Sequence, residues 1–201
     1  LKKKFGKNKF YLSKIISSPI SINNNIILSD NSGTIFNVNE SGKINWKKNI
    51  YSKMYKKVFK NLSFSIHQDK IFISDNLGFV YAVDMNTGEE IWLKNHGIPL
   101  KSRIKVLEKK IFLIDQDNTI ICLDTDNGST VWTIRTISSF IKSQNFLSLA
   151  ISKTGNLFAL NSSGDLIKIN SNNGQILWSL NSARSLYDLD TDFFKSSDVV
   201  I

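Results

Sequence analysis

Apolar and polar residues alternate along most of the chain, in short runs separated by turn residues. In the stretch GFVYAVDMNTGEEIW, residues 78–92, the side chains of Phe79, Tyr81 and Val83 share one face of a predicted β-strand. Residues 84–88 are typical of a turn, because Asp and Asn bond to their own backbone and Gly adopts positive φ without strain. A second apolar strand resumes at Ile91. The pattern therefore predicts a β-hairpin.

The same hairpin occurs four times. The other copies are GTIFNVNESGKINW (33–46), NTIICLDTDNGSTVW (118–132) and GDLIKINSNNGQILW (164–178). In every copy a turn Gly lies four residues before Trp, and successive Trp residues are 46, 40 and 46 positions apart. A period of about 40–45 residues with four strands each is typical of β-propeller blades. The repeat residues are Gly42, Trp46, Gly88, Trp92, Gly128, Trp132, Gly174 and Trp178.

Two further predicted strands precede each hairpin, so each repeat supplies four strands. These strands are 20–22 and 26–28, 62–66 and 71–73, 104–106 and 111–114, and 147–151 and 157–160. The predicted fold is all-β, a propeller of four-stranded antiparallel blades, with about four and a half blades present of an expected eight. We expect a basic leader at 1–14, blades at about 15–49, 61–94, 102–135 and 146–180, and the start of another at 181–201.

The four Trp residues are predicted to be structural. An isolated blade exposes apolar surface that a neighbouring blade buries. A large flat ring covers such a seam well, and its N–H can reach a backbone carbonyl. Asn118 stands where the other repeats have Gly, and Asn is the residue that next best tolerates the left-handed conformation. Cys122 is the only cysteine, so its apolar strand predicts a small buried side chain and excludes an internal disulfide.

The chain is basic, with 26 Lys and Arg against 17 Asp and Glu and a net charge of +9. Such a charge can indicate nucleic-acid or membrane binding. Only three of the basic residues are Arg, the better phosphate ligand, so we do not expect nucleic-acid binding. The densest basic run extends from Lys47 to Lys60, between two blades. There a solvated linker is the default interpretation and an acidic surface or partner is the alternative.

Catalytic motifs are not found. Residues 124–128 resemble the start of a calcium loop, but Gly comes one residue early and the twelfth position is Arg135. His67 and His96 fall in different predicted blades, and no nucleophile motif accompanies them. We therefore expect no catalytic, cofactor-binding or metal-binding residues. A repeat protein of this kind is expected to use its loop surfaces for binding.

The repeat G-x-hydrophobic-Tyr-Ala-hydrophobic-Asp-x-x-Thr-Gly-x-x-hydrophobic-Trp resembles the PQQ-like repeat of quinoprotein-type propellers. The resemblance covers residues 15–180 in four copies, with departures at Asn118 and at residues 35–38. Within that superfamily the chain is most similar to the propeller lipoproteins of the bacterial outer-membrane β-barrel assembly machinery, the BamB family. The similarity lies in four plain blades, a Lys-rich insert after the first Trp, and no cofactor signature.

This resemblance implies a scaffold without catalysis or cofactor, located at the periplasmic face of the outer membrane. Members of the family are eight-bladed and bind the periplasmic domains of the barrel-inserting subunit through loops near the junction of the third and fourth blades. In this chain the junction is 137–145, and Phe140, Ile141 and Lys142 are the candidate partner-binding residues. A plain inter-blade connection is the alternative. The lipid anchor would lie outside these residues and would supply the expected link to the membrane.

Two other functions remain open from the sequence. A quinoprotein dehydrogenase shares the repeat but needs a calcium-bound quinone, a catalytic Asp and usually vicinal cysteines, and Cys122 has no neighbouring Cys. A ligand-sensing or carbohydrate-binding propeller is the other alternative. Asp190 and Asp192 fall near a second contact region of the assembly family, in a poorer register.

Overall fold

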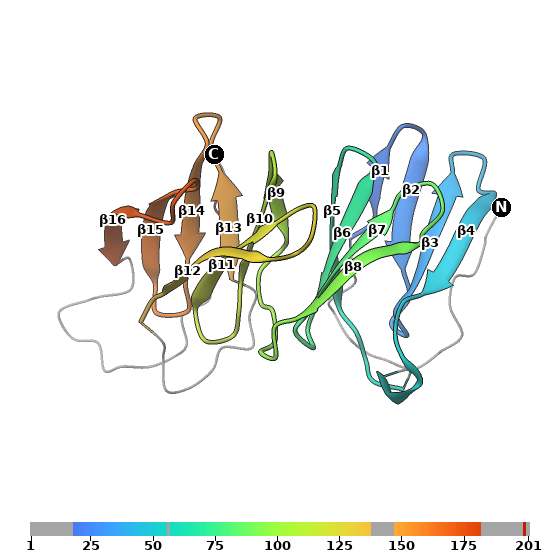
Figure 1. The fold of residues 1–201 in the computed structure, drawn as a ribbon, viewed down its shortest axis with the longest axis horizontal. Coiled ribbons are helices and arrows are strands. Elements are labelled where there is room, and N and C mark those ends of the chain that lie inside the picture. Colours follow the sequence, from blue (N-terminus) through green and yellow to red (C-terminus); the bar gives the residue numbers. More distant parts are fainter. Residues whose placement is uncertain (1–17, 56, 138–146, 182–198, 200–201) are drawn as a thin grey trace. The chain divides into compact units, whose positions relative to one another are not determined.

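The computed structural model describes residues 18–55, 57–137, 147–181 and 199. These residues form sixteen β-strands in four antiparallel sheets of four strands (Figure 1), which confirms the predicted all-β propeller class. The chain divides into two compact units, Leu1–Asn95 and His96–Ile201, and each unit holds two of the sheets. Within the described residues, none of the helical structure is long and apolar enough to cross a membrane.

In the first unit, neighbouring strands in each sheet follow one another in the sequence. The first blade contains β1 (Ile20–Ile22), β2 (Asn25–Ser29), β3 (Thr34–Asn39) and β4 (Ile44–Asn49). The second contains β5 (Leu62–His67), β6 (Lys70–Asp75), β7 (Phe79–Asp84) and β8 (Glu90–Asn95). The blades share an apolar core in which Ile27, Ile71 and Ile73 are fully buried.

The second unit repeats this arrangement. The third blade contains β9 (Lys105–Leu107), β10 (Lys110–Ile114), β11 (Thr119–Asp124) and β12 (Thr130–Arg135). The fourth contains β13 (Ser148–Ile151), β14 (Asn156–Leu160), β15 (Asp165–Asn170) and β16 (Ile176–Asn181). Phe112, Leu157 and Ile169 are fully buried in the core that these two blades share. Beyond them, the backbone N–H of Val199 donates to Ser148 Oγ at 2.7 Å, which brings this residue next to β13.

The strands lie where the hydrophobic pattern predicts them, within one or two residues. One difference is in the turn between the predicted strands 62–66 and 71–73, which is shorter than the four residues left between them. His67 ends β5 and Lys70 begins β6, so only Gln68 and Asp69 turn. Gln68 has a φ of 54°, a left-handed conformation that permits a two-residue hairpin. β9 begins one residue later than predicted, at Lys105.

A β-bulge interrupts the pairing of the third and fourth strands in each of the four blades. It leaves unpaired the single residue that precedes each Trp, at positions 45, 91, 131 and 177. The Trp residues pair across the bulge with Asn37, Ala82, Cys122 and Lys168. Because a bulge turns the side chains beside it, its fixed place in the repeat gives each Trp the same direction relative to its own blade.

The Lys-rich connection between the first two blades differs from the predicted solvated linker. Lys47 and Lys48 belong to β4, and a 3-10 helix, η1 (Lys53–Tyr55), follows. The side chain of Lys60 is buried, with 2% of its surface exposed. Its Nζ donates to the carbonyls of Tyr55 and Val58, the latter at 2.8 Å. The solvated interpretation is therefore wrong for Lys60, because backbone carbonyls replace its water.

Candidate partner-binding site at the junction of the third and fourth blades

Trp132 of the third blade closes onto the hairpin turn of the fourth blade. Its Nε1 donates to the carbonyl of Ser171 at 3.2 Å, and its ring lies against Gly174. A Cβ atom added to Gly174 would lie 2.9 Å from Cδ2 of the ring, closer than side chains pack. Gly174 also has a φ of 77°, a conformation that favours glycine. In this seam the Trp132 ring therefore covers the turn of the next blade, and its N–H reaches a backbone carbonyl.

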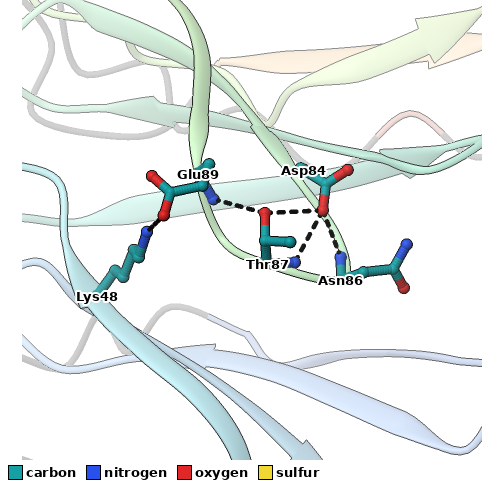
Figure 2. A network of polar contacts seen from close by, with 5 residues as sticks. All are labelled: Lys48, Asp84, Asn86, Thr87 and Glu89. Carbon is teal, nitrogen blue, oxygen red and sulfur yellow. Dashed lines mark hydrogen bonds and ion pairs between the residues drawn. The ribbon is translucent and has the colours of Figure 1, made fainter.

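The seam between the first two blades has the same construction. Trp46 Nε1 donates to the carbonyl of Met85 at 2.9 Å, and a Cβ on Gly88 would lie 2.7 Å from Cε3 of its ring. Figure 2 shows the polar edge of this seam, where Lys48 of β4 forms an ion pair with Glu89 in the turn of the second blade. Two seams with one geometry indicate that the contact is a property of the repeat.

Hydrogen bonds within the turn preform its shape. Asp84 Oδ1 accepts from the backbone N–H groups of Thr87 and Asn86 at 2.8 and 2.9 Å, and from the Thr87 hydroxyl at 3.0 Å (Figure 2). These bonds, above all that from the Thr87 N–H, hold the pKa of Asp84 below its usual value. The same N–H contacts recur at Asp124, which accepts from Asp126 and Asn127. Residues 124–128 therefore form a hairpin turn, as predicted.

The remaining repeat residues keep the expected places in their hairpins. Gly42 and Gly128 have φ values of 78° and 70° in their turns. Trp92 is buried, with 9% of its surface exposed, whereas Trp178 on β16 is 41% exposed.

A second contact ties each connection to the blade that follows it. The turn between the second and third strands begins with Asp or Asn, whose Oδ1 accepts the N–H groups two and four residues ahead. These residues are Asp30, Asp75, Asp115 and Asn161. In three of these residues, the second polar atom of the side chain (Oδ2 or Nδ2) forms a hydrogen bond with a residue of the preceding connection. That residue lies four or five positions after the preceding Trp. The pairs are Asp75–Tyr51, Asp115–His96 and Asn161–Thr136.

The chemistry of this second contact varies while its place stays fixed. Tyr51 donates its hydroxyl to Asp75, and burial raises the pKa of both groups. His96 Nε2 lies 3.0 Å from Asp115 Oδ2, and Asn161 Nδ2 donates to Thr136 Oγ1 at 3.2 Å. Because three different partners occupy one position of the repeat, we interpret the His96–Asp115 pair as structural. His67, at the end of β5, lies in the other unit.

The predicted contact residues Phe140, Ile141 and Lys142 lie outside the described residues, as do Asp190 and Asp192. The two flanks of the contact segment are described. Before it, the carbonyl of Ile137 accepts from Asn118 Nδ2 at 2.9 Å and from Ser163 Oγ at 3.4 Å, and the Ile137 side chain is 64% exposed. After it, the N–H of Leu147 donates to the carbonyl of Lys101 at 2.8 Å. Both ends of the segment are thus held by the third and fourth blades.

Asn118 is the residue at this junction that the sequence analysis undervalued. Its φ of 61° confirms the predicted left-handed conformation. Its side chain is buried and also joins the two blades, because Nδ2 donates to Ser162 Oγ at 2.8 Å and Oδ1 accepts from the Ser162 N–H at 3.2 Å. Gly at the equivalent positions of other repeats has no side chain to make these bonds. That departure from the repeat was the available signal.

Cys122 is a buried spacer beside this seam. It pairs with Trp132 on one side and with Phe112 of β10 on the other, and the rings of these two residues have centroids 5.8 Å apart. Burial raises the pKa of the Cys122 thiol to about 12, so it is a poor nucleophile at neutral pH. Among the described residues, no group of three or more His, Cys, Asp or Glu side chains could hold a metal ion.

Comparison with known proteins now places this geometry in a family. A family model described as outer membrane protein assembly factor BamB matches residues 31–187. The chain belongs to this family. A BamB of Alkalilimnicola ehrlichii is 22% identical over 123 residues, a match that covers 58% of this chain and 31% of that protein. The chain therefore spans about a third of that relative.

Solved structures give the same fold. The crystal structure of BamB from Moraxella catarrhalis matches with a TM-score of 0.75 and 15% identity, over 90% of this chain and 53% of that one. Quinohemoprotein alcohol dehydrogenase from Comamonas testosteroni matches with a TM-score of 0.65 and 9% identity, over 83% of this chain and 35% of that one. At these identities the likeness shows the fold alone, a propeller that both a BamB and a dehydrogenase use.

Proposed function

We propose that the chain is a non-catalytic scaffold in the assembly of outer-membrane β-barrel proteins. Its membership of a family described as outer membrane protein assembly factor BamB is the observation that carries this proposal. The contacts of Trp46, Trp132 and Asp75 are consistent with a scaffold, because they join neighbouring blades within each unit. The proposed location is the periplasmic face of the outer membrane, with a lipid anchor outside these residues.

The proposed contact surface is the segment centred on Phe140, Ile141 and Lys142, and the proposed partner is the periplasmic part of the barrel-inserting subunit. Two observations support this choice. Both flanks of the segment are fixed to the blades, through Ile137 and Leu147. The segment also places an aromatic and an aliphatic side chain beside a cation, and interfaces combine apolar anchors at their centre with a polar rim.

A binding experiment tests this proposal directly. The 201-residue chain would be immobilised and titrated with the purified periplasmic domains of the subunit, using biolayer interferometry. The double variant Phe140→Ser with Lys142→Glu is expected to weaken binding by about tenfold or more, because it removes an apolar anchor and reverses a charge. The matched control is Lys153→Glu, an exposed residue in the turn between β13 and β14 of the fourth blade.

The control is expected to bind as the unaltered chain does. Equal binding by the double variant and the unaltered chain would overturn the assignment of the surface. Absence of binding by the unaltered chain would overturn the proposed partner. Circular dichroism of each variant would establish that the sheets are retained.

The second candidate is a quinone-dependent dehydrogenase, which the fold match to the Comamonas testosteroni enzyme favours. Its test is reconstitution with pyrroloquinoline quinone and calcium, followed by alcohol-dependent reduction of an artificial electron acceptor. Our proposal predicts no turnover above that of the quinone alone. Turnover that increases in proportion to protein concentration would contradict the scaffold proposal and show that the chain is an enzyme.

A further inference from the structure

A second surface, away from the proposed contact segment, has a composition of its own. Between Glu40 and Asp69 the sequence contains seven lysines and no acidic residue. Two of these lysines have partners in the first unit: Lys48 forms a surface ion pair with Glu89, and Lys60 is buried against backbone carbonyls. Among the described residues, the other lysines of this stretch are exposed: Lys43, Lys47, Lys53 and Lys57.

The outward-facing part of the connection is the turn that contains η1. Lys53, Met54, Lys57 and Val58 are all exposed, and Met54 has 75% of its surface in contact with water. Among the described residues, neither Lys53 nor Lys57 forms an ion pair. We call these four residues the Lys53–Val58 surface. In Figure 1 the turn, in teal, lies beyond the strand ends of the first two blades.

Buried polar side chains hold the turn that carries this surface in place. Lys60 Nζ donates to the carbonyls of Tyr55 and Val58 and lies 4.7 Å from the centre of the Tyr51 ring. Tyr51 in turn donates its hydroxyl to Asp75 of β6. The turn is thus tied to the second blade through side chains that are themselves buried. A fixed turn loses little conformational freedom when it binds, which favours the affinity of a small surface.

We propose that the Lys53–Val58 surface binds anionic phospholipid headgroups, with Met54 and Val58 entering the apolar boundary beneath them. Two cations beside two exposed apolar side chains match a layer of negative charge that covers hydrocarbon. Lysines are attracted to anionic lipid as point charges, and a lipid layer also offers the exposed Met54 and Val58 a hydrocarbon boundary that an acidic segment lacks. The chemistry therefore favours a lipid surface over an acidic protein segment. This attachment does not depend on the proposed protein contact.

Vesicle co-sedimentation of the full 201-residue chain tests the proposal. The probes are phosphatidylethanolamine vesicles with and without phosphatidylglycerol. We expect binding only to the anionic vesicles. The variant Lys53→Glu with Lys57→Glu is expected to lose about tenfold or more in apparent affinity, since each surface lysine contributes several-fold. Met54→Ser with Val58→Ser is expected to retain weak binding at low salt and lose it as the salt concentration rises.

The matched control is Lys109→Glu with Lys153→Glu, which makes the same change of net charge at exposed positions of the second unit. Our proposal predicts that this control binds vesicles like the unaltered chain. Equal losses in the control and in the Lys53 and Lys57 variant would reduce the effect to net charge and overturn the site. Binding of polyglutamate without binding of anionic vesicles would assign the turn to an acidic protein segment and overturn the lipid proposal.

Discussion

At the scale of single residues, the hairpin glycine meets two separate demands. Gly174 has a φ of 77°, and the ring of Trp132 occupies the space where a Cβ would lie. Gly155 in the same blade has a φ of 79°, yet the nearest atom to its added Cβ is 3.8 Å away, on Leu107. The two positions thus share the backbone demand and differ in the steric one.

Substituting Ala for each of these two glycines separates the cost of backbone strain from the cost of the steric clash with Trp132. Gly155→Ala is expected to lower the free energy of unfolding by about 1 kcal/mol, from backbone strain alone. Gly174→Ala is expected to cost about 2–4 kcal/mol, because a clash with the indole adds to that strain. Urea denaturation followed by tryptophan fluorescence measures both. Equal losses would show that the Trp132 ring moves aside without cost, contrary to our account of the seam.

At the scale of elements, the tie between a connection and the next blade contains a buried carboxyl group. Burial raises the pKa of Asp75 in the folded chain, whereas an unfolded Asp ionises near pH 4. As the pH rises above about 4, the unfolded chain therefore releases a proton that the folded chain still holds. The contribution of this group to stability falls with rising pH until Asp75 also ionises in the folded state.

Asp75→Asn is expected to remove this pH dependence. Asn161 already fills the equivalent turn of the fourth blade and accepts the same pair of N–H groups, so the amide is compatible with the turn. Relative to the unaltered chain, the variant should gain about 1 kcal/mol in the free energy of unfolding between pH 4 and pH 7. Urea titrations at both pH values measure this change. A constant difference between the two proteins would contradict it.

The strands could be predicted because their information is local. Alternating side chains, turn residues and the Gly-to-Trp spacing act within a few positions, and they placed the hairpin 78–92 nearly residue by residue. The bulge before each Trp was missed, since the pattern gives no sign of an unpaired residue. The ties from Tyr51 to Asp75 and from Asn118 to Ser162 join positions 24 and 44 residues apart, and such contacts depend on how the blades pack.

The candidate site likewise has one feature that the sequence could predict and others that only the packed structure shows. The repeat places a connection between the third and fourth blades, so its position followed from the Trp spacing. That Asn118 fixes Ile137, or that Lys60 lies inside the protein under a basic run, followed only from the packed structure. The sequence shows charge, but burial decides whether a lysine faces a partner or a carbonyl.

At the scale of the whole molecule, the four Trp residues share one sequence position but not one environment. Trp132 has a bonded partner in the next turn, whereas Trp178 is 41% exposed. Trp132→Ala is expected to lower the free energy of unfolding by about 2–4 kcal/mol, somewhat below the range for a fully buried aromatic residue, because Trp132 is half-buried and hydrogen-bonded. Trp178→Ala should cost about 1–2 kcal/mol, in line with its smaller buried area. Urea midpoints of the two variants give the comparison, and equal losses would contradict it.

The seam also affects how such a protein can change in length. Every repeat has both a Trp and a turn Gly in its sequence, and in the two described seams the Trp of one blade lies against the turn Gly of the next. A duplicated copy of the repeat would therefore bring a complementary surface for each of its neighbours and need no new pair of residues. Evolution by tandem duplication can add or remove blades in this architecture, while each surviving seam keeps the same chemistry.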